Sequence, residues 1–163
     1  TKRVFFIKII KIMKLGTYGN GNTKFNKLTI SKCSLTMWDS VKYGSWGCGA
    51  TALGLITGDN PFHITNKRKH FSDRFMVEYL RKRNFSIHEV TQSNLSNKKK
   101  WSHSISDNHL LLFSMLIQKK ECTWMVGWNN LLYHNFEILK TNYLDFINFP
   151  IDSMYVVYKK DWK

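Results

Sequence analysis

Residues 44–58, GSWGCGATALGLITG, decide the predicted fold because they join a glycine-rich loop to a helix. Gly44 and Gly47 allow tight or left-handed backbone conformations in the loop. Ser45 is a candidate N-cap, and the small and apolar residues that follow continue as a short buried helix. Gly58 is expected to end this helix.

Cys48 is the residue of this stretch that points to a chemical activity. It is expected in the first helical turn, where the positive end of the helix dipole favours thiolate over thiol. The thiolate is the form in which a cysteine acts as a nucleophile. Cys48 fits equally well as a small buried apolar residue in a helix that packs through glycine and alanine.

The composition predicts one globular domain in a reducing compartment. A chain of 163 residues with 43% hydrophobic residues and six tryptophans can bury a core without disulfides or metal. Its three cysteines form no CxxC motif and no paired Cys/His spacing, which argues against a disulfide framework and a structural zinc site. We expect neither a metal nor a cofactor. A reducing compartment would be the cytoplasm of a host cell, a virion or the interior of an organelle.

The charge raises the question of an acidic partner. The chain carries a formal net charge of +14, which suits nucleic acid or a neighbouring subunit of an assembly. Lysine far outnumbers arginine, however, and this bias indicates an AT-rich gene of a phage, virus or organelle more than a selected phosphate reader. The candidate contact residues are Lys98, Lys99 and Lys100, in a polar excursion over residues 91–107.

Two parts are expected along the chain. Residues 1–27 form a basic, apolar segment followed by a loop, and residues 28–163 form a single domain. The stretch 2–14 is too short to span a bilayer, and its basic residues make it too charged, so no transmembrane segment is expected. It is predicted as a strand packed on the domain, with a membrane-surface or targeting segment as the alternative.

The order of elements predicts an α+β fold. The turn Asp59-Asn60-Pro61 ends the cysteine helix, and a second helix follows with Ser72 as N-cap. Its apolar stripe consists of Phe75, Met76, Tyr79 and Leu80. Strands are expected within residues 28–38, 85–90, 109–117, 122–128, 131–138 and 154–158.

A hairpin is predicted around Lys119-Lys120, followed by a tight turn at Asn129-Asn130. If Gln118 faces Glu121, counting back places His109 opposite Asn130, whose amide would orient the imidazole. In the alternative arrangement Asp107 caps a helix over residues 110–117, and His109 then leaves the site.

The residues resemble the papain-like cysteine peptidases. The resemblance rests on a Gly-Ser-x-Gly-Cys loop that opens a helix, a second helix, and an antiparallel sheet with His at the start of one strand and Asn at the end of the next. The version Cys-Gly-Ala-Thr-Ala-Leu is similar to peptidases that process double-glycine leader peptides and to small phage-encoded relatives. The resemblance covers about residues 38–138. It implies a cysteine-bearing helix packed on an antiparallel sheet, and a thiol hydrolase that acts on a peptide or isopeptide bond.

The resemblance also implies roles for individual residues. Cys48 would be the nucleophile, and its backbone amide would help to hold the oxyanion. His109 would be the general base, and Asn130, or Asn129 if the register slips by one, would orient it. The family usually has a glutamine about six residues before the cysteine as second oxyanion donor, and here Lys42 or Tyr43 lies in that neighbourhood.

A second departure from the family leads to a different function. The leader-peptide type often has a His-Trp-Val-Val motif, and its nearest match here is Thr123-Trp124-Met125-Val126. With that alignment Thr123 replaces the base, and the protein is an inactive papain-like relative that serves as a structural or binding component of a virion or another large assembly. His134 is a candidate base in another register, and Cys33 and Cys122 are expected as packing residues. The side chain that faces Cys48 separates these functions.

Overall fold

A computed structural model describes residues 26–39, 47–67, 71–90, 105, 107–118, 121–129, 131–135, 137–140 and 150–162 of the chain. The strand predicted within residues 2–14 lies outside these ranges. None of the helices in the described ranges is long and apolar enough to cross a membrane.

The described chain has an α+β fold. Its helices are η1 (Asn26–Leu28), α3 (Cys48–Thr57), α4 (Pro61–Lys67), α5 (Asp73–Arg81) and η3 (Lys160–Trp162). Its strands are β1 (Ser86–Val90), β2 (Leu110–Gln118), β3 (Glu121–Trp128), β4 (Leu131–His134), β5 (Glu137–Lys140) and β6 (Ile151–Tyr158). They form one antiparallel sheet in the order β1-β6-β2-β3-β4-β5.

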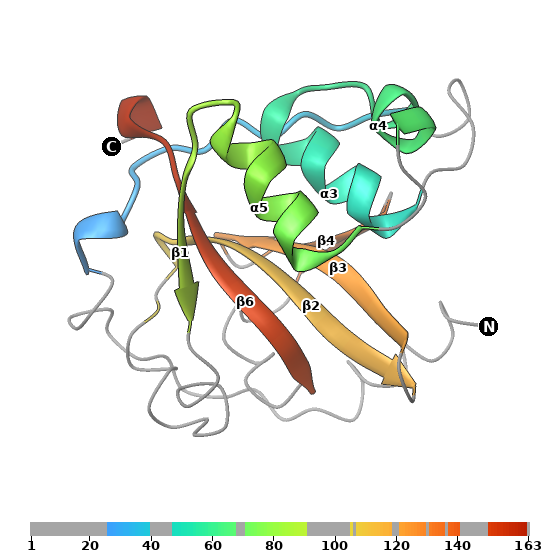
Figure 1. Cartoon of the computed structure of the whole chain (residues 1–163). Coiled ribbons are helices and arrows are strands. Elements are labelled where there is room, and N and C mark those ends of the chain that lie inside the picture. The colour runs from blue at the N-terminus through green and yellow to red at the C-terminus, as the bar shows by residue number, and fades with distance from the viewer. Residues whose placement is uncertain are drawn as a thin grey trace.

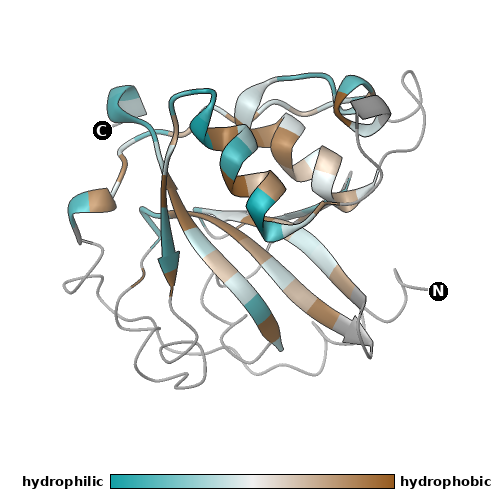
Figure 2. Ribbon diagram, in the orientation of Figure 1, coloured by the Kyte–Doolittle hydropathy of each residue, from teal (hydrophilic) through white to brown (hydrophobic). Residues whose placement is uncertain are grey.

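The helices α3, α4 and α5 lie on one side of this sheet (Figure 1). Every residue of α3 from Gly49 to Ile56 is buried, whereas α5 buries only Met76, Tyr79 and Leu80. Figure 2 shows the same contrast, since α5 alternates hydrophilic and hydrophobic residues while α3 carries few hydrophilic ones. Helix α3 is therefore the central element of the layer, and α5 is its amphipathic neighbour.

The ends of α3 follow the glycines of the sequence. Gly58 ends the helix with φ 80°, the left-handed conformation that a residue without Cβ adopts at low cost, so this prediction is confirmed. The predicted N-cap is wrong. Gly47 and not Ser45 holds the cap position, because the helix starts directly at Cys48, and no side chain caps it.

The second predicted helix is confirmed as α5, with Ser72 as its N-cap. The Ser72 hydroxyl accepts a hydrogen bond from the backbone N–H of Phe75 at 3.2 Å. The short helix α4 was not predicted. Asn60 Oδ1 accepts the N–H of Phe62 at 2.9 Å, and Pro61 suits the first helical position because it has no N–H to leave unpaired.

The strand predicted within residues 28–38 does not form. This segment runs over α3 instead: the N–H of Thr36 donates to Leu55 O at 2.9 Å, and Trp38 Nε1 donates to Gly54 O at 3.3 Å. The donors of this segment therefore bond to carbonyl oxygens near the C-terminal end of α3 and not to a neighbouring strand.

The predicted strands at 85–90, 109–117, 122–128 and 154–158 are confirmed as β1, β2, β3 and β6. The alternative helix over 110–117 is therefore wrong. The strand predicted at 131–138 is two strands, because Asn135 adopts φ 53° and begins a tight turn between His134 and Glu137.

The hairpin of β2 and β3 has the predicted turn but not the predicted register. Gln118 pairs with Glu121, yet Cys122 pairs with Leu116, because a bulge adds one residue to β2. Extending the last pair, Leu111 with Gly127, sets His109 level with Asn129 and not with Asn130.

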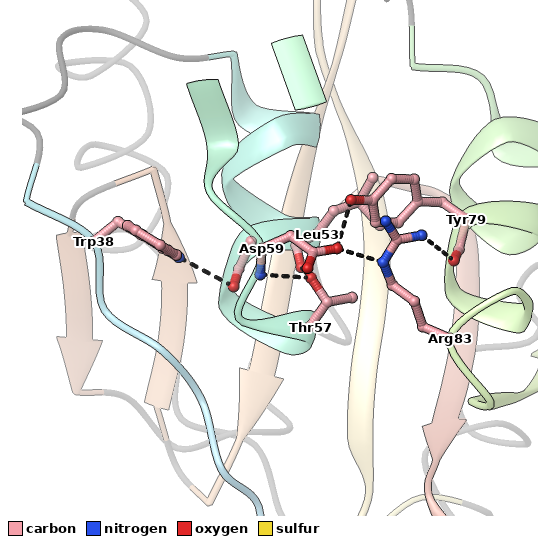
Figure 3. A network of polar contacts seen from close by, with 7 residues as sticks. Trp38, Leu53, Thr57, Asp59, Tyr79 and Arg83 are labelled. Carbon is pink, nitrogen blue, oxygen red and sulfur yellow. Dashed lines mark hydrogen bonds and ion pairs between the residues drawn. The ribbon is translucent and has the colours of Figure 1, made fainter. Parts of the chain in front are cut away.

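A polar network joins the C-terminal ends of α3 and α5 (Figure 3). Asp59 Oδ2 accepts hydrogen bonds from the Tyr79 hydroxyl, at 2.6 Å, and from Arg83 Nε. The guanidinium of Arg83 lies 3.5 Å from the centre of the Tyr79 ring, and the N–H of Asp59 donates to Thr57 Oγ1 at 3.1 Å. Burial alone would raise the pKa of Asp59, but the hydrogen bonds from Tyr79 and Arg83 and the nearby guanidinium charge hold it below its usual value.

Candidate functional site

The candidate site lies where the N-terminal ends of α3 and α5 meet the sheet. A Cβ atom added to Gly49, in the first turn of α3, would come 2.5 Å from Cγ of Phe71. Phe71 directly precedes Ser72, the N-cap of α5. The close approach therefore needs glycine at position 49 and fixes the start of both helices side by side.

Cys48 reaches β3 from the first turn of α3. Its side chain is half-buried, and Sγ accepts a hydrogen bond from the backbone N–H of Trp124 at 3.4 Å. Trp124 is held in turn, because its indole Nε1 donates to Phe71 O at 3.0 Å and its ring is buried. The sulfur is thus positioned by the first turn of α3 and by the backbone of Trp124, and the Trp124 side chain is held by the carbonyl of Phe71.

The segment 123–126, which resembles the His-Trp-Val-Val motif, is therefore the part of the sheet that lies at Cys48. Thr123 stands at the position of the motif's histidine, and its Oγ1 lies 2.7 Å from Nε2 of His134 on β4. Trp124 packs in the core beneath the helices, so the alternation of side chains along β3 directs Thr123 to the opposite face. The side chain of Thr123 therefore does not face Cys48, and this geometry does not support the alternative in which Thr123 takes the place of the base.

The structure does not bring His109 to Cys48. Trp124 pairs with Ser114, and His109 lies five residues before Ser114, roughly 16 Å along the strand. The prediction that His109 is the base of Cys48 is contradicted by this register. The reason is topological: Cys48 docks at the start of β3, which an antiparallel hairpin places beside the end of β2 and not beside its beginning.

His109 is fully buried and level with Asn129, whose φ of 48° belongs to the turn between β3 and β4. The extended register thus brings His109 level with the asparagine that was the alternative partner, but at the far end of the hairpin from the thiol. The other predicted site residues lie outside the described ranges: Asn130, Lys42, Tyr43, Lys98, Lys99 and Lys100.

Polar side chains that were not predicted lie around Cys122, on the strand that Cys48 reaches. The thiol of Cys122, an exposed residue two positions before Trp124, donates to Asp152 Oδ2 at 3.9 Å. Burial raises the pKa of Cys122, and the carboxylates of Asp152 and Asp73 raise it further. No sequence pattern links these residues, since they come from β3, from β6 and from the start of α5.

An open groove of about 380 Å³ continues from this cluster along α5 to the edge strand β1. Asp73 is shared by this cluster and the groove, and its Oδ2 accepts a hydrogen bond from the Tyr155 hydroxyl at 2.6 Å. The groove is lined by charged and apolar residues from α5, β1 and β6: Asp73, Arg74, Val77, Glu78, Arg81, Ile87, Glu89 and Tyr155. Arg74 is paired with Glu78 at 3.0 Å, while Arg81 and Glu89 make no ion pair with the described residues.

The remaining cysteine is chemically distinct. Cys33 packs against the core, and burial raises the pKa of its thiol to about 12. In the described ranges no three His, Cys, Asp or Glu side chains lie close enough together to hold a metal ion.

Comparisons of the chain with known protein families, with curated proteins and with solved structures found no match. What the site does is therefore inferred from the arrangement of Cys48, Trp124 and Thr123.

Proposed function

We propose that this protein is a papain-like domain that binds an extended polypeptide segment and does not hydrolyse its amide bonds. The observation that carries the proposal is the hydrogen bond from the Trp124 backbone to Cys48 Sγ, with threonine at the adjacent position. The thiol of the papain-like arrangement is kept, and the hydrogen bond that it accepts from the described residues comes from a backbone N–H and not from a histidine.

Amide hydrolysis by a thiol needs a proton donor as much as a nucleophile. The leaving amine must be protonated, and in papain-like peptidases a histidine takes the thiol proton and delivers it. The hydrogen-bond partner of Cys48 among the described residues is a backbone N–H, which can orient the sulfur but cannot exchange a proton with substrate. Tetrahedral intermediates formed at Cys48 would therefore collapse back to substrate.

The groove beside the site supports binding of a polypeptide. It lies between α5 and the strands β1 and β6, β1 is the outer strand among the described ones, and extended peptides commonly add to such an edge. Glu89 and Arg81 offer one charge of each sign that forms no ion pair within the described ranges, and Val77 and Ile87 provide apolar contacts. A segment with alternating apolar and charged side chains fits this lining.

One contact favours a second candidate, a thiol hydrolase. Thr123 Oγ1 lies 2.7 Å from His134 Nε2, and a hydrolase would need this hydroxyl to reach Cys48 Sγ as well, so that it could pass a proton between the thiol and the imidazole. The strand pleat opposes this function, because it directs the Thr123 side chain to the face away from α3.

A library of synthetic decapeptides separates the two functions. The full chain is immobilised and incubated with the library, and mass spectrometry identifies both retained and cleaved peptides. We expect retained peptides and no cleavage, and the same result with Cys48→Ala. Glu89→Lys, in the groove, should change which peptides are retained, whereas Lys82→Glu, an exposed control on the end of α5, should not. Cleavage that Cys48→Ala abolishes would establish the hydrolase instead.

A further inference from the structure

Two of the three cysteines lie at the same stretch of β3. Cys48 Sγ is 3.4 Å from the backbone nitrogen of Trp124, and Cys122 is two residues before Trp124 on that strand. Residues two apart on a strand project from the same face and are roughly 7 Å apart along it. Cys122 therefore projects from the face that carries Trp124, the face that the helices cover, next to the place where the Cys48 sulfur docks.

The two thiols also share an electrostatic environment. After burial and the carboxylates of Asp152 and Asp73, a negative charge on Cys48 is a further cause that raises the pKa of Cys122. Cys122 is exposed and Cys48 is half-buried, so a small oxidant reaches both from the open side of the site. Asp152, at 3.9 Å, is the one hydrogen-bond acceptor that the described residues offer to the Cys122 thiol, and rotation of the side chain breaks this weak contact.

Cys33 provides an internal contrast. It packs against the core, and burial raises the pKa of its thiol to about 12, so it stays protonated and unreactive near neutral pH.

We infer that Cys48 and Cys122 form a reversible intramolecular disulfide under oxidation by a hydroperoxide, and that this bond closes the site. The closing of the site rests on the proposed function, whereas formation of the bond does not. The disulfide would tie the first turn of α3 to β3 and remove the free sulfur from the approach to the groove.

The chemistry balances with a hydroperoxide as oxidant. A thiolate attacks the terminal peroxide oxygen, the O–O bond breaks, and the other oxygen leaves and takes a proton, which gives an alcohol from an organic hydroperoxide and water from hydrogen peroxide. The resulting sulfenic acid is attacked by the second thiolate, the S–S bond forms, the S–O bond breaks, and water leaves. Two thiols are oxidised and one peroxide is reduced.

Hydrogen peroxide titration of the full chain tests the inference. After the remaining thiols are blocked, mass spectrometry should find one peptide pair joined through Cys48 and Cys122, with Cys33 still available for alkylation. Dithiothreitol should reverse the bond. In Cys122→Ser the sulfenic acid at Cys48 should persist and react with dimedone. In wild type, dimedone should label Cys48 only weakly, because the disulfide forms first. Cys33→Ser is the matched control and should form the same bond as wild type.

Three results would overturn the inference: equal dimedone labelling of Cys48 in wild type and Cys122→Ser, a bond that contains Cys33, or bonds only between two chains. Peptide retention is measured separately on the oxidised chain. If the bond forms and retention is unchanged, the bond does not close the site. If no peptide is retained even by the reduced chain, the proposed function fails while the disulfide stands.

Discussion

The two ends of helices α3 and α5 carry opposite kinds of polar chemistry. At the C-terminal ends, the carboxylate of Asp59 is matched by a hydroxyl and a guanidinium, so its charge is fully compensated. At the N-terminal ends, the thiols of Cys48 and Cys122 each have one long hydrogen bond to the described part of the chain, to a backbone N–H and to a carboxylate. The same pair of helices is thus fastened at one end and leaves reactive groups weakly held at the other.

The difference shows which end stabilises the fold and which end is available for function. Hydrogen bonds to a charged group contribute about 1.5–3 kcal/mol each when they are shielded from water, whereas weak thiol contacts contribute little. Substitutions at the C-terminal end should therefore change stability, and substitutions of the thiols should change chemistry. The N-terminal end has one stability requirement of its own, the tight packing at Gly49.

The largest effect is expected from Gly49→Ala. The new Cβ would lie 2.5–2.9 Å from three atoms of Phe71, an aromatic side chain that cannot give way without moving the loop before α5. We expect a loss of about 2–3 kcal/mol in the free energy of unfolding, measured by urea denaturation. A change below about 0.5 kcal/mol would mean that the two helix starts are not in close contact.

Asp59→Asn should have the next largest effect. It removes the charge that Tyr79 and Arg83 share and should cost about 1–2 kcal/mol at neutral pH, a value reduced for the partial exposure of the pair. The control is Glu78→Gln, which breaks the exposed pair with Arg74 and should cost about 0.5 kcal/mol or less.

The pH dependence gives a second check on Asp59. Its pKa is lower in the folded chain than in the unfolded chain, so its stabilisation is present above the unfolded value of about 3.9 and is lost as the pH falls through the folded value. The stability difference between wild type and Asp59→Asn should shrink over that acidic range. A difference that stays constant down to low pH would show that the charge of Asp59 does not stabilise the fold.

Gly47→Ser is the smallest expected change. Gly47 caps α3 with an extended backbone, φ −70° and ψ 158°, and a Cβ there meets no atom within 4 Å. A serine hydroxyl can accept one of the free N–H groups of the first turn, so thermal unfolding should show a gain of a few tenths of a kcal/mol, roughly 0.3. A loss above about 1 kcal/mol would contradict the open surroundings of Gly47 and remove the contrast with Gly49.

Features that depend on neighbouring residues could be predicted from the sequence. Gly58 ends α3 in the left-handed conformation that suits a residue without Cβ, and Ser72 caps α5 through its own hydroxyl. Asn129 after β3 adopts the positive φ expected of a turn residue. Asn135 was missed because apolar residues on both sides of it fit one continuous strand as well as two short ones.

The candidate site depends on distant contacts, and these could not be predicted. The position of Cys48 over the sheet is set by Gly49 against Phe71 and by the indole of Trp124, which no local pattern encodes. A single bulge in β2 was enough to shift the partner of His109 by one residue. The match of residues 123–126 to a known motif was the one sequence signal that pointed to the correct strand.

In the proposed function Cys48 has no histidine partner. The most direct test is the rate of Cys48 alkylation with iodoacetamide from mildly acidic to alkaline pH, followed by mass spectrometry that distinguishes Cys48 from Cys33 and Cys122. The variants are His109→Gln and His134→Gln, each checked for native circular dichroism. We predict that both give the pH profile of wild type. If wild-type Cys48 reacts at acidic pH and either variant loses that reactivity, a Cys-His pair exists and the proposed function is contradicted.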